Sequence, residues 1–511
     1  MREQEQARRV KRLRRTGADW FGLVSMILLM ICSLVLMIQL MSTQLLTDLY
    51  LILIEVVLLL INAGHAIIQL PIRWIKTDKI ICGLVALLLS AAMLYGMSAA
   101  GSLQDVLQRI SGKTIEKTTS YVLVMADDPA RSIGDTQGYT FGLLQEEDME
   151  NTNALLEDIE TGLGAVHTVS YDSPTRLADA LYDSEAGAII LNAGYVSALE
   201  ATEGYESFST DTRILYEFST TREVEPIAPN AAITTEPFVV YCSGIDARSS
   251  DISIQSLSDV NILAVIHPRT HQILLINTPR DYYVPLAFNG QRDKLTHAGV
   301  YGITESAAVL GNLYGVQPDY YARVNFYGLK QIVDALGGVD VYSDYDFSTV
   351  GMEVPNDNGQ GVHFARYSFT QGYNHVNGEQ AILFARERHA FNDGDNQRGK
   401  NQMAVIKAIV DKGTSPAILK GYQEVLNAVA DSFITNMNYE DISSLVQMQL
   451  RDGAQWNVTT YSVSGSGSME YCYSMPDMEL SVMWPNASQI NTAKSLIQQV
   501  MNGETPVMPE D

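Results

Sequence analysis

The sequence predicts an α/β protein with three N-terminal transmembrane helices, a small α/β accessory domain and a mixed α/β/α sandwich. Three observations predict this architecture. Long apolar runs crowd the first hundred residues, strand and helix patterns alternate over residues 115–225, and a second alternation covers residues 238–502. A chain of 511 residues is long enough for two or three packed units besides its membrane segments.

The first membrane helix is predicted at residues 20–41, which carry no charge. At about 1.5 Å per residue, this run reaches across a hydrocarbon core of roughly 30 Å. Residues 49–70 and 80–100 satisfy the same length test. Residues 20–101 are therefore expected to hold three transmembrane helices, which place the two ends of the chain on opposite sides of the membrane.

The orientation of these helices follows from the distribution of Lys and Arg. Basic residues gather in the arm at residues 1–19 and in the loop at 71–79, whereas the loop at 41–48 has none. Basic loops stay in the cytoplasm. We therefore predict a multi-pass protein of the cell membrane with a cytoplasmic N-terminus, and an extracytoplasmic location for everything after about residue 101.

The chain is strongly acidic, with 59 Asp and Glu against 34 Lys and Arg and a formal net charge of −25. This negative charge disfavours nucleic acid as a partner, because like charges repel. An anionic ligand would therefore need a local cluster of Arg. Cys242 and Cys472 lie in the predicted exterior part and could form a disulfide. The sequence leaves that pairing open, because pairing depends on distances.

The accessory domain is predicted at residues 115–225, where short strand and helix patterns follow one another. Ser173 is expected to cap one of its helices, with Pro174 in the first turn. The domain lacks a cluster of His, Cys or paired carboxylates, so a spacer or partner-binding role is favoured. The strands are expected at 119–126, 167–171 and 187–191, and the helices at 151–162 and 173–182.

A proline-containing extended linker is predicted at residues 226–237, before the larger domain at 238–502. The acidic tail at 503–511 is predicted to be disordered. Within the larger domain, strands are expected at 237–244, 259–268 and 272–281, and helices at 303–314, 327–336, 378–388 and 398–411.

Three motifs in this larger domain carry the candidate chemistry. The first is SGIDAR at 243–248, followed by LSDVNILAVI at 257–266. The second is NTPRDYYVPL at 277–286, followed by RDKLTHAGVYG at 292–302. The third is NGEQAILFARERH at 377–389, followed by QRGKNQMAVIKAI at 397–409.

Helical spacing limits how the third motif can act. Arg398 and Gln402 are four residues apart and share one helix face, opposite a packing face that includes Val405. Arg386 and Arg388 are two apart and cannot share a helix face, so their helix should end near them. Guanidinium groups bind phosphate oxygens bidentately, so converging Arg side chains suit a pyrophosphate.

In their order and spacing, these motifs resemble those of the LytR–CpsA–Psr family of extracytoplasmic phosphotransferases. The resemblance covers roughly residues 238–411, with a weaker match to 502. It implies that the domain at 238–502 is catalytic and that Asp246 and Asp259 hold Mg²⁺ or Mn²⁺, since hard cations take carboxylate oxygens. It also implies a set of phosphate-binding and catalytic residues: Arg280, Asp281, Arg386, Arg388, Arg398 and Gln402, with Arg248, Lys294 and Gln371 as weaker candidates.

The resemblance implies transfer of a glycopolymer, teichoic acid or capsular polysaccharide, from a polyprenyl-pyrophosphate carrier onto peptidoglycan, with formation of a phosphodiester. Asp281 or Asp259 is a candidate general base. Two other functions remain open: a membrane-bound regulator or transcription attenuator of the cell envelope, and a polyprenyl-pyrophosphate pyrophosphatase. The sequence lacks G-x-x-x-x-G-K-[ST], H-E-x-x-H and a strand-linked G-x-G-x-x-G, which disfavours ATP-driven and zinc-protease chemistry.

Structural alternatives also stay open for each motif. Asp246 and Asp259 could simply cap turns. Arg280 and Asp281 could form a structural ion pair, and Arg386 and Arg388 could be surface charges paired with Glu387 or Asp393. The Asn-, Asp- and Gly-rich segment between residues 344 and 371 fits no pattern that the sequence suggests.

Overall fold

The structure, a computed structural model, divides into two compact units. Asp246 and Arg248 lie outside the described residues, as do Asp393 and the arm before residue 16. The described residues are 16–71, 76–111, 115–145, 148–223, 230, 232–245, 255–356, 361–392, 394–414, 428 and 433–509.

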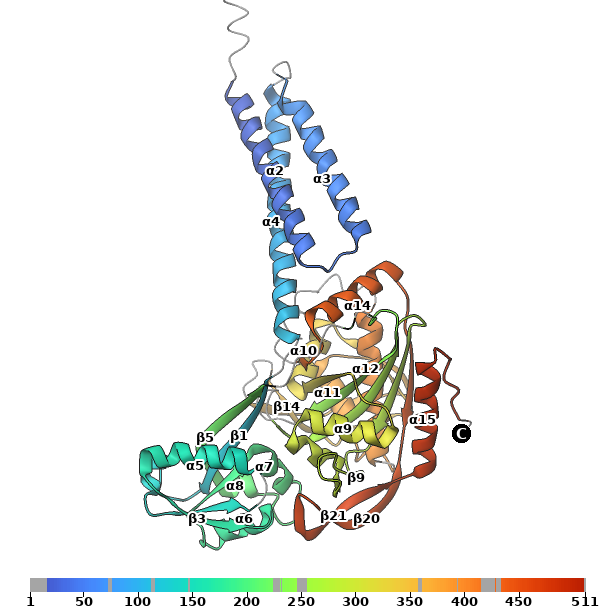
Figure 1. The fold of residues 1–511 in the computed structure, drawn as a ribbon. Helices are drawn as coiled ribbons and strands as arrows, with labels where there is room; N and C mark the ends of the chain where they lie inside the picture. The colour runs from blue at the N-terminus through green and yellow to red at the C-terminus, as the bar shows by residue number, and fades with distance from the viewer. Residues whose placement is uncertain are drawn as a thin grey trace, which may run out of the picture. The chain divides into compact units, whose positions relative to one another are not determined.

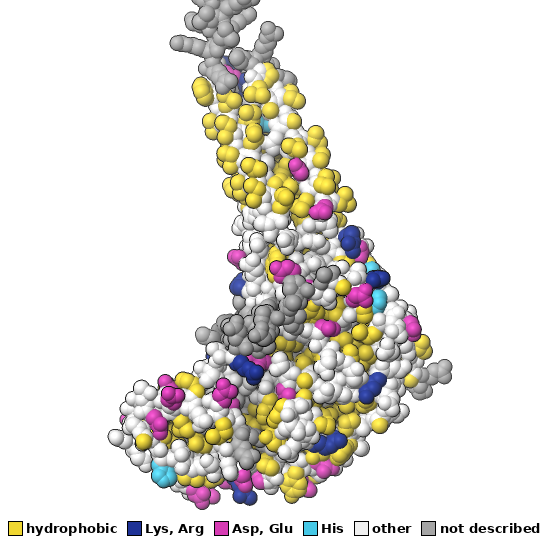
Figure 2. Space-filling view, in the orientation of Figure 1, with side chains coloured by type: hydrophobic (Ala, Val, Ile, Leu, Met, Phe, Trp, Pro, Cys, Tyr) yellow, Lys and Arg dark blue, Asp and Glu magenta, His cyan; other side chains and the backbone are white. Residues whose placement is uncertain are grey.

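The first unit contains the three predicted N-terminal helices, which are confirmed. Each is long and apolar enough to cross a membrane, and Figure 2 shows hydrophobic side chains over much of their visible surface. The helices are α2 (Gly17–Ser42), α3 (Asp48–Gln69) and α4 (Lys76–Ile110).

A buried polar contact joins the ends of these helices. Lys79 Nζ lies 2.6 Å from Asp19 Oδ1 and also donates to the carbonyl of Gln69 at 3.2 Å. Since burial of an unpaired charge is costly, this pairing holds the start of α2, the end of α3 and the start of α4 at one end of the bundle. The same unit includes α14 (Tyr439–Asp452), whose Tyr439 hydroxyl donates to the carbonyl of Thr43.

The second unit begins with a five-stranded sheet in the order β3-β2-β4-β1-β5. The predicted strands and helices of residues 115–225 are found, and the Ser173 hydroxyl accepts the amide of Arg176 as the expected cap. The sequence did not reveal β2 and β5. The strands are β1 (Ile115–Met125), β2 (Thr140–Leu144), β3 (His167–Tyr171), β4 (Ala188–Asn192) and β5 (Thr212–Glu223).

Short helices connect these strands. They are η1 (Ile133–Thr136), α5 (Met149–Leu163), α6 (Pro174–Tyr182), α7 (Ala193–Glu200) and α8 (Phe208–Asp211). Strand β2 runs parallel to both β3 and β4. The carboxyl ends of these three strands therefore meet at one edge of the sheet.

A six-stranded sheet in the order β18-β11-β6-β7-β8-β19 forms the centre of the larger domain (Figure 1). Its middle strands β6, β7 and β8 are antiparallel, and β11 and β19 add parallel neighbours. The strands are β6 (Phe238–Ile245), β7 (Ser258–His267), β8 (Gln272–Thr278), β11 (Tyr320–Asn325), β18 (Phe433–Thr435) and β19 (Asn457–Ser462).

Helices cover both faces of this sheet, so the predicted α/β/α sandwich is confirmed. On one face Val239, Tyr241 and Leu263 pack with α9 (Ile303–Tyr314) and α15 (Ala487–Met501). On the other, α12 (Gly394–Gly413) contacts β8 and β19. Two more helices, α10 (Phe326–Ala335) and α11 (Gly378–Arg386), pack with α12 around Val333, Phe384 and Val405.

The segment that fitted no sequence pattern folds into small antiparallel pairs, β12 with β17, β13 with β16 and β14 with β15. Its register depends on cross-strand contacts such as Phe347 with Phe369, which local patterns do not show. The strands are β12 (Val339–Ser343), β13 (Phe347–Ser348), β14 (Met352–Pro355), β15 (Val362–Ala365), β16 (Ser368–Phe369) and β17 (Gly372–Val376).

Two further hairpins complete the larger domain. Strands β9 (Tyr283–Pro285) and β10 (Arg292–Lys294) form one, β20 (Gly465–Cys472) and β21 (Met475–Pro485) the other, and η2 (Leu295–Tyr301) follows β10. Residues of the accessory domain, such as Leu191 and Phe208, share one buried cluster with Val300 and Met475 of the larger domain. A common core therefore joins the two domains.

Two local expectations differ from the structure. Residues 232–236 form a hydrogen-bonded turn, with the Thr235 amide donating to the Ala232 carbonyl, where an extended linker was expected. Ile233 in this turn is buried, which explains why the segment folds back. The described tail at 503–509 is likewise held, because the Val507 amide donates to Gln499 Oε1 at 2.7 Å.

Candidate functional site

The sheet places the first two motifs at one edge. Strands β7 and β8 are antiparallel with Asn261 opposite Thr278, so the start of β7 lies beside the end of β8. Asp259 is the second residue of β7, and Arg280 and Asp281 follow β8 directly. The pairing of the sheet therefore brings together residues 21 positions apart in sequence.

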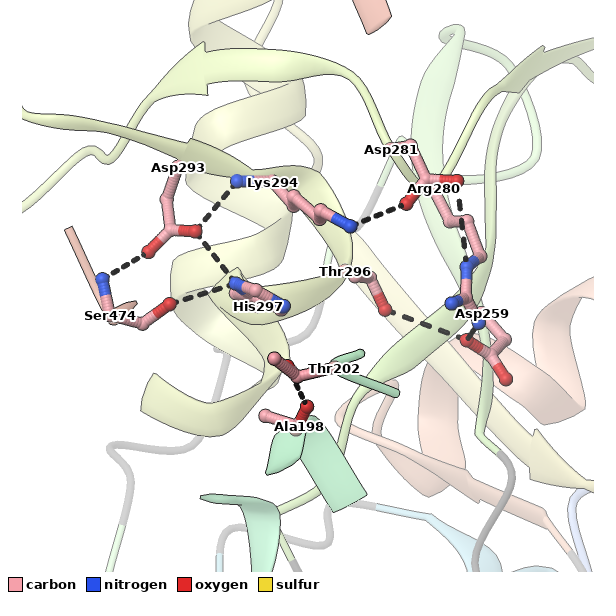
Figure 3. A network of polar contacts seen from close by, with 10 residues as sticks. All are labelled: Ala198, Thr202, Asp259, Arg280, Asp281, Asp293, Lys294, Thr296, His297 and Ser474. Atoms are coloured by element: carbon pink, nitrogen blue, oxygen red, sulfur yellow. Dashed lines mark hydrogen bonds and ion pairs between the residues drawn. The ribbon is translucent and has the colours of Figure 1, made fainter. Parts of the chain in front are cut away.

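These residues form a chain of alternating charges that extends to Lys294 (Figure 3). Arg280 Nη1 lies 2.5 Å from Asp259 Oδ1, and its Nε lies 3.8 Å from Asp281 Oδ2. The other oxygen of Asp281 is 3.4 Å from Lys294 Nζ. Asp259 Oδ1 also lies 3.5 Å from the hydroxyl of Thr296. The four side chains are between 12% and 23% exposed, so they remain accessible to a ligand.

A buried hydrogen-bond network lies on the side of β10 that faces away from the Lys294 side chain. Asp293 neighbours Lys294 and points away from it, since side chains alternate along a strand. Asp293 Oδ1 lies 2.7 Å from His297 Nδ1, and Asp293 Oδ2 accepts the Ser474 amide at 2.8 Å. The Ser474 hydroxyl lies 2.8 Å from the same His297 nitrogen. Burial favours the neutral acid, but His297 and Ser474 outweigh it and lower the pKa of Asp293.

Helix α11 ends where the spacing of Arg386 and Arg388 requires. A capping box at Asn377 and Gln380 begins the helix, Arg386 is its last residue, and Glu387 is extended. The Arg386 guanidinium lies over the ring of Phe326, 4.3 Å from its centroid, a favourable cation–π distance. This confirms that the helix ends near the two Arg residues.

Glu387 anchors the turn after α11. Its Oε2 accepts the amide of Val350 at 2.8 Å, and its Oε1 accepts the amides of His389 at 2.7 Å and Ala390 at 3.0 Å. The side chain is buried, so these bonds matter for stability. Glu387 therefore holds the backbone that carries Arg388.

Helix α12 carries Arg398 and Gln402, which line one cavity, as their spacing of four residues predicts. Val405 follows Arg398 by seven residues and so lies within about 20° of it around the helix, not on the opposite face as expected. A close approach to the sheet makes this placement possible at Gly399. A Cβ atom at Gly399 would lie 2.0 Å from Nδ2 of Asn277, the penultimate residue of β8. A larger residue at this position would require either the Asn277 side chain or α12, with Arg398, to move.

A cavity of about 690 Å³ unites these groups. This volume lies in the range of about 300–1,000 Å³ that small-molecule sites occupy. Five Lys or Arg and four Asp or Glu side chains line it, a positive local balance in a chain of net charge −25. The predicted residues that line it are Asp259, Arg280, Asp281, Lys294, Arg386, Arg388, Arg398 and Gln402.

Sequence reasoning missed several residues of this cavity. Glu200 and Ala201 come from the end of α7 in the accessory domain, where the Thr202 hydroxyl donates to the Ala198 carbonyl at 2.8 Å (Figure 3). Only tertiary packing brings them here, and no local pattern marks them. His389, in contrast, stands beside Arg388 in the motif ARERH and could have been noticed.

Gln371 does not line this cavity, and its backbone amide donates to Asp346 Oδ1 at 2.7 Å. Among the described residues, no group of three or more His, Cys, Asp or Glu side chains could hold a metal ion. Of the predicted metal pair, Asp246 and Asp259, only Asp259 lies among the described residues. Its carboxylate faces a cavity rich in phosphate-binding groups, which fits Mg²⁺, since this ion commonly takes one or two carboxylates with phosphate and water.

Cys242 and Cys472 are both free thiols in the structure. Burial raises the pKa of the Cys242 thiol to about 12 and also raises the pKa of the Cys472 thiol. Thiolates are the reactive form, so both cysteines are poor nucleophiles.

The chain matches the model of the LytR_cpsA_psr family over residues 203–489. The polyisoprenyl-teichoic acid–peptidoglycan teichoic acid transferase TagU of Enterococcus faecalis is 34% identical over 211 residues, which are 41% of this chain and 65% of that protein. The TagU of Bacillus anthracis is 32% identical over 209 residues, which are 41% and 63% of the two chains. The chain thus spans less than two thirds of the length of these relatives.

Solved structures also resemble this chain. That of B. subtilis TagV is 23% identical with a TM-score of 0.41, over 53% of this chain and 99% of that one. A structure of TagT bound to LI-WTA is 22% identical with a TM-score of 0.40, over 54% and 94% of the two chains.

Proposed function

The chain belongs to the LytR–CpsA–Psr family, and from this premise we propose that it is a membrane-anchored glycopolymer phosphotransferase. The observation that carries the proposal is the cavity in which four Arg, one Lys and two Asp converge from three motifs. The donor would be a glycopolymer on a polyprenyl-pyrophosphate carrier, and the acceptor would be peptidoglycan. The relatives named as teichoic acid transferases support this choice of donor and acceptor.

The reaction would form one phosphodiester and break one phosphoanhydride. A hydroxyl of the acceptor sugar attacks the phosphorus nearer the glycopolymer, the bond to the lipid phosphate breaks, and polyprenyl phosphate leaves with the electron pair. The hydroxyl proton goes to a base, for which Asp259 and Asp281 are the candidates among the four carboxylates at the cavity. Phosphoryl transfer needs mainly alignment and charge neutralisation, so no covalent enzyme intermediate is required.

Within this scheme Arg280, Arg386, Arg388 and Arg398 would bind diphosphate oxygens, helped by Lys294 and Gln402. Asp246 and Asp259 would hold Mg²⁺ or Mn²⁺, which would neutralise phosphate charge. Asp281 contacts both Arg280 and Lys294, so we assign it a positioning role towards these two cations. Cation–π contact orients Arg386, and the amide bonds of Glu387 orient the backbone at Arg388.

Transfer is tested with the full-length protein in detergent, a polyprenyl-pyrophosphate-linked glycopolymer, Mg²⁺ and insoluble peptidoglycan. We expect covalently attached glycopolymer and an equal amount of released polyprenyl phosphate. Omission of peptidoglycan should stop turnover. Equal turnover without peptidoglycan would instead identify a pyrophosphatase, and the absence of both products would overturn the proposal.

We further propose that the N-terminus is cytoplasmic and that residues 102–511 lie outside the cytoplasm. The Lys and Arg of the arm and of the loop at 71–79 support this orientation. In spheroplasts, added protease should digest residues 237–502. Protection of that segment in intact spheroplasts would reverse the assignment.

A further inference from the structure

A second cavity, of about 470 Å³, lies between the accessory domain and the two hairpins of the larger domain. We propose that it is a saccharide-binding subsite for the glycan that reacts in the first cavity. The proposal deepens the proposed function and rests on it for the biological role of the saccharide. Saccharide binding itself can be measured independently of transfer.

The accessory domain forms one wall of this cavity. This wall lies where ligands commonly bind in open α/β sheets. Gln145 directly follows β2 and Asp172 directly follows β3, and these two strands are parallel neighbours. Ligands of such sheets bind outside the carboxyl ends of the strands. Gln145 is exposed, and within the described residues its side-chain amide makes no hydrogen bond. Its donor and acceptor therefore remain available to a ligand.

The opposite wall is aromatic and rigid. The Tyr283 hydroxyl donates to the carbonyl of Tyr471 at 2.7 Å, which joins β9 to β20. The ring of Tyr283 packs edge-on against Trp484 with centroids 5.1 Å apart. The side chain of Tyr471 is 56% exposed, in contrast to the buried Tyr283. Tyr471 thus offers an open aromatic face, the kind of surface that packs against the C–H face of a sugar ring.

Arg292 is a fixed donor on this wall. Its guanidinium lies 4.7 Å from the centroid of the Trp484 ring and 5.6 Å from that of Tyr283, and its Nη1 donates to the Tyr283 carbonyl at 2.8 Å. A guanidinium has five N–H groups, and among the described residues only this one bond uses them. Such a planar donor, held in place, can bind vicinal hydroxyls or an acyl oxygen bidentately.

The combination of groups identifies the ligand class. An apolar ligand would leave the Gln145 amide and most N–H groups of Arg292 without partners, and the charge of Asp172, which pairs with Arg176 at 3.4 Å, opposes a purely anionic ligand. A saccharide matches both features, since its ring faces are apolar and its edges carry hydroxyl donors and acceptors. The cavity volume lies within the ligand-site range of about 300–1,000 Å³.

Strand β10 connects the two cavities. Arg292 lines the second cavity and Lys294 lines the first, and these residues lie on the same face of the strand about 7 Å apart. The accessory domain contributes to both cavities, through Gln145 to the second and Glu200 to the first. The Thr175 hydroxyl donates to Asp477 of β21 at 2.6 Å, which fixes the two walls relative to each other.

Two sources could supply this saccharide: the carrier-linked glycopolymer and the peptidoglycan strand. The experiment measures ligand-detected NMR titrations of the full-length protein in detergent with two probes. One is a soluble tetrasaccharide of alternating N-acetylglucosamine and N-acetylmuramic acid, and the other is a carrier-free teichoic acid oligomer. The probe that binds identifies the source.

The variants are Tyr471→Ala and Gln145→Ala, whose side chains are exposed, so the fold should tolerate both changes. The matched control is Tyr373→Ala, which removes an exposed tyrosine of β17 that lies outside both cavities. We expect each cavity variant to weaken binding on the order of tenfold, and the control to bind as the wild type does.

Binding of neither probe, or equal binding by the wild type and both cavity variants, would overturn the subsite. The transfer assay distinguishes this failure from a failure of the proposed function. Normal transfer without saccharide binding would refute the subsite alone, and saccharide binding at the cavity without transfer would refute the phosphotransferase alone.

Discussion

Two polar networks meet at strand β10 and differ in what surrounds them (Figure 3). Asp293, His297 and Ser474 are buried and bond to one another and to backbone amides. Asp259, Arg280, Asp281 and Lys294 line a cavity and pair only in part. We call the first network closed, because its polar atoms bond to one another, and it contributes to the stability of the fold. We call the second network open, because it lines a cavity and keeps charges available for a ligand.

The open network should respond most strongly to a change at Asp259. We expect Asp259→Asn to lower transfer on the order of a hundredfold, because it removes a charge that binds Arg280 and that we propose as a metal ligand. The melting temperature should stay close to the wild-type value, since partly exposed ion pairs contribute little to stability. Transfer after chelation should need more added Mg²⁺ than the wild type needs.

The matched control for this variant is Asp340→Asn, which removes an exposed partner of His375 outside the cavity. It should leave transfer unchanged. An unaltered Mg²⁺ requirement in Asp259→Asn would place the carboxylate outside the metal site and would break the contrast between the two networks.

The closed network should respond in stability. Asp293→Asn should lower the free energy of unfolding by about 1.5–3 kcal/mol at pH 7, the scale of buried hydrogen bonds to a charged group. The folded-state pKa of Asp293 is lowered, so its ionisation stabilises the fold above the unfolded pKa of about 3.9. That contribution disappears as the pH falls through the lower folded pKa.

Denaturant titrations at several pH values measure this contribution. The difference between wild type and Asp293→Asn should be full at neutral pH and should shrink below about pH 4. A difference that does not depend on pH would mean that the shape of the side chain, and not its charge, stabilises the junction of β10 with the β20–β21 hairpin.

Arg388 offers a smaller test. A Lys supplies the charge without the planar fork, so Arg388→Lys should weaken binding of a polyprenyl-pyrophosphate substrate on the order of tenfold. Its thermal melt should hardly move. Arg366→Lys, an exposed Arg outside the cavity, is the control. Wild-type affinity in Arg388→Lys would contradict the phosphate-binding role.

A substitution at Glu387 distinguishes a phosphate-binding role of Arg388 from a structural ion pair between Arg388 and Glu387. Because its carboxylate accepts three backbone amides, Glu387→Gln should lower the melting temperature, which Arg388→Lys should not do. If Arg388 were a structural partner of Glu387, both substitutions would lower the melting temperature and leave binding intact.

The sequence predicted the elements that carry strong local signals. Helix α9 has the predicted bounds, since it lies between Gly302 and Gly315, both at positive φ. Helix α12 begins four residues earlier than predicted, at Gly394, because its apolar pattern starts only after Arg398. The end of α11 at Arg386 followed from the spacing of two Arg residues.

The parts that the sequence did not predict depend on tertiary packing. Glu200 joins the cavity through the core that the accessory and larger domains share, and no periodicity marks that contact. The stacking of Arg386 on Phe326 joins residues 60 positions apart. The small strand pairs of residues 339–376 need cross-strand partners, so the segment between residues 344 and 371 fitted no local sequence pattern.

The smallest expected effect concerns the thiols, and it tests whether the larger domain depends on a covalent link besides its polar networks. Cys242 and Cys472 are free, and burial raises the pKa of both. Reductant should therefore leave the melting temperature unchanged, and a thiol reagent should label neither cysteine until the protein unfolds. A disulfide between them would close a loop of more than two hundred residues and would contribute about 2–4 kcal/mol. A fall of several degrees in the melting temperature on reduction would thus reveal that disulfide. The disulfide would then stabilise the larger domain in addition to the buried network of Asp293. An unchanged melting temperature together with the pH-dependent loss in Asp293→Asn assigns that junction to hydrogen bonds and burial alone.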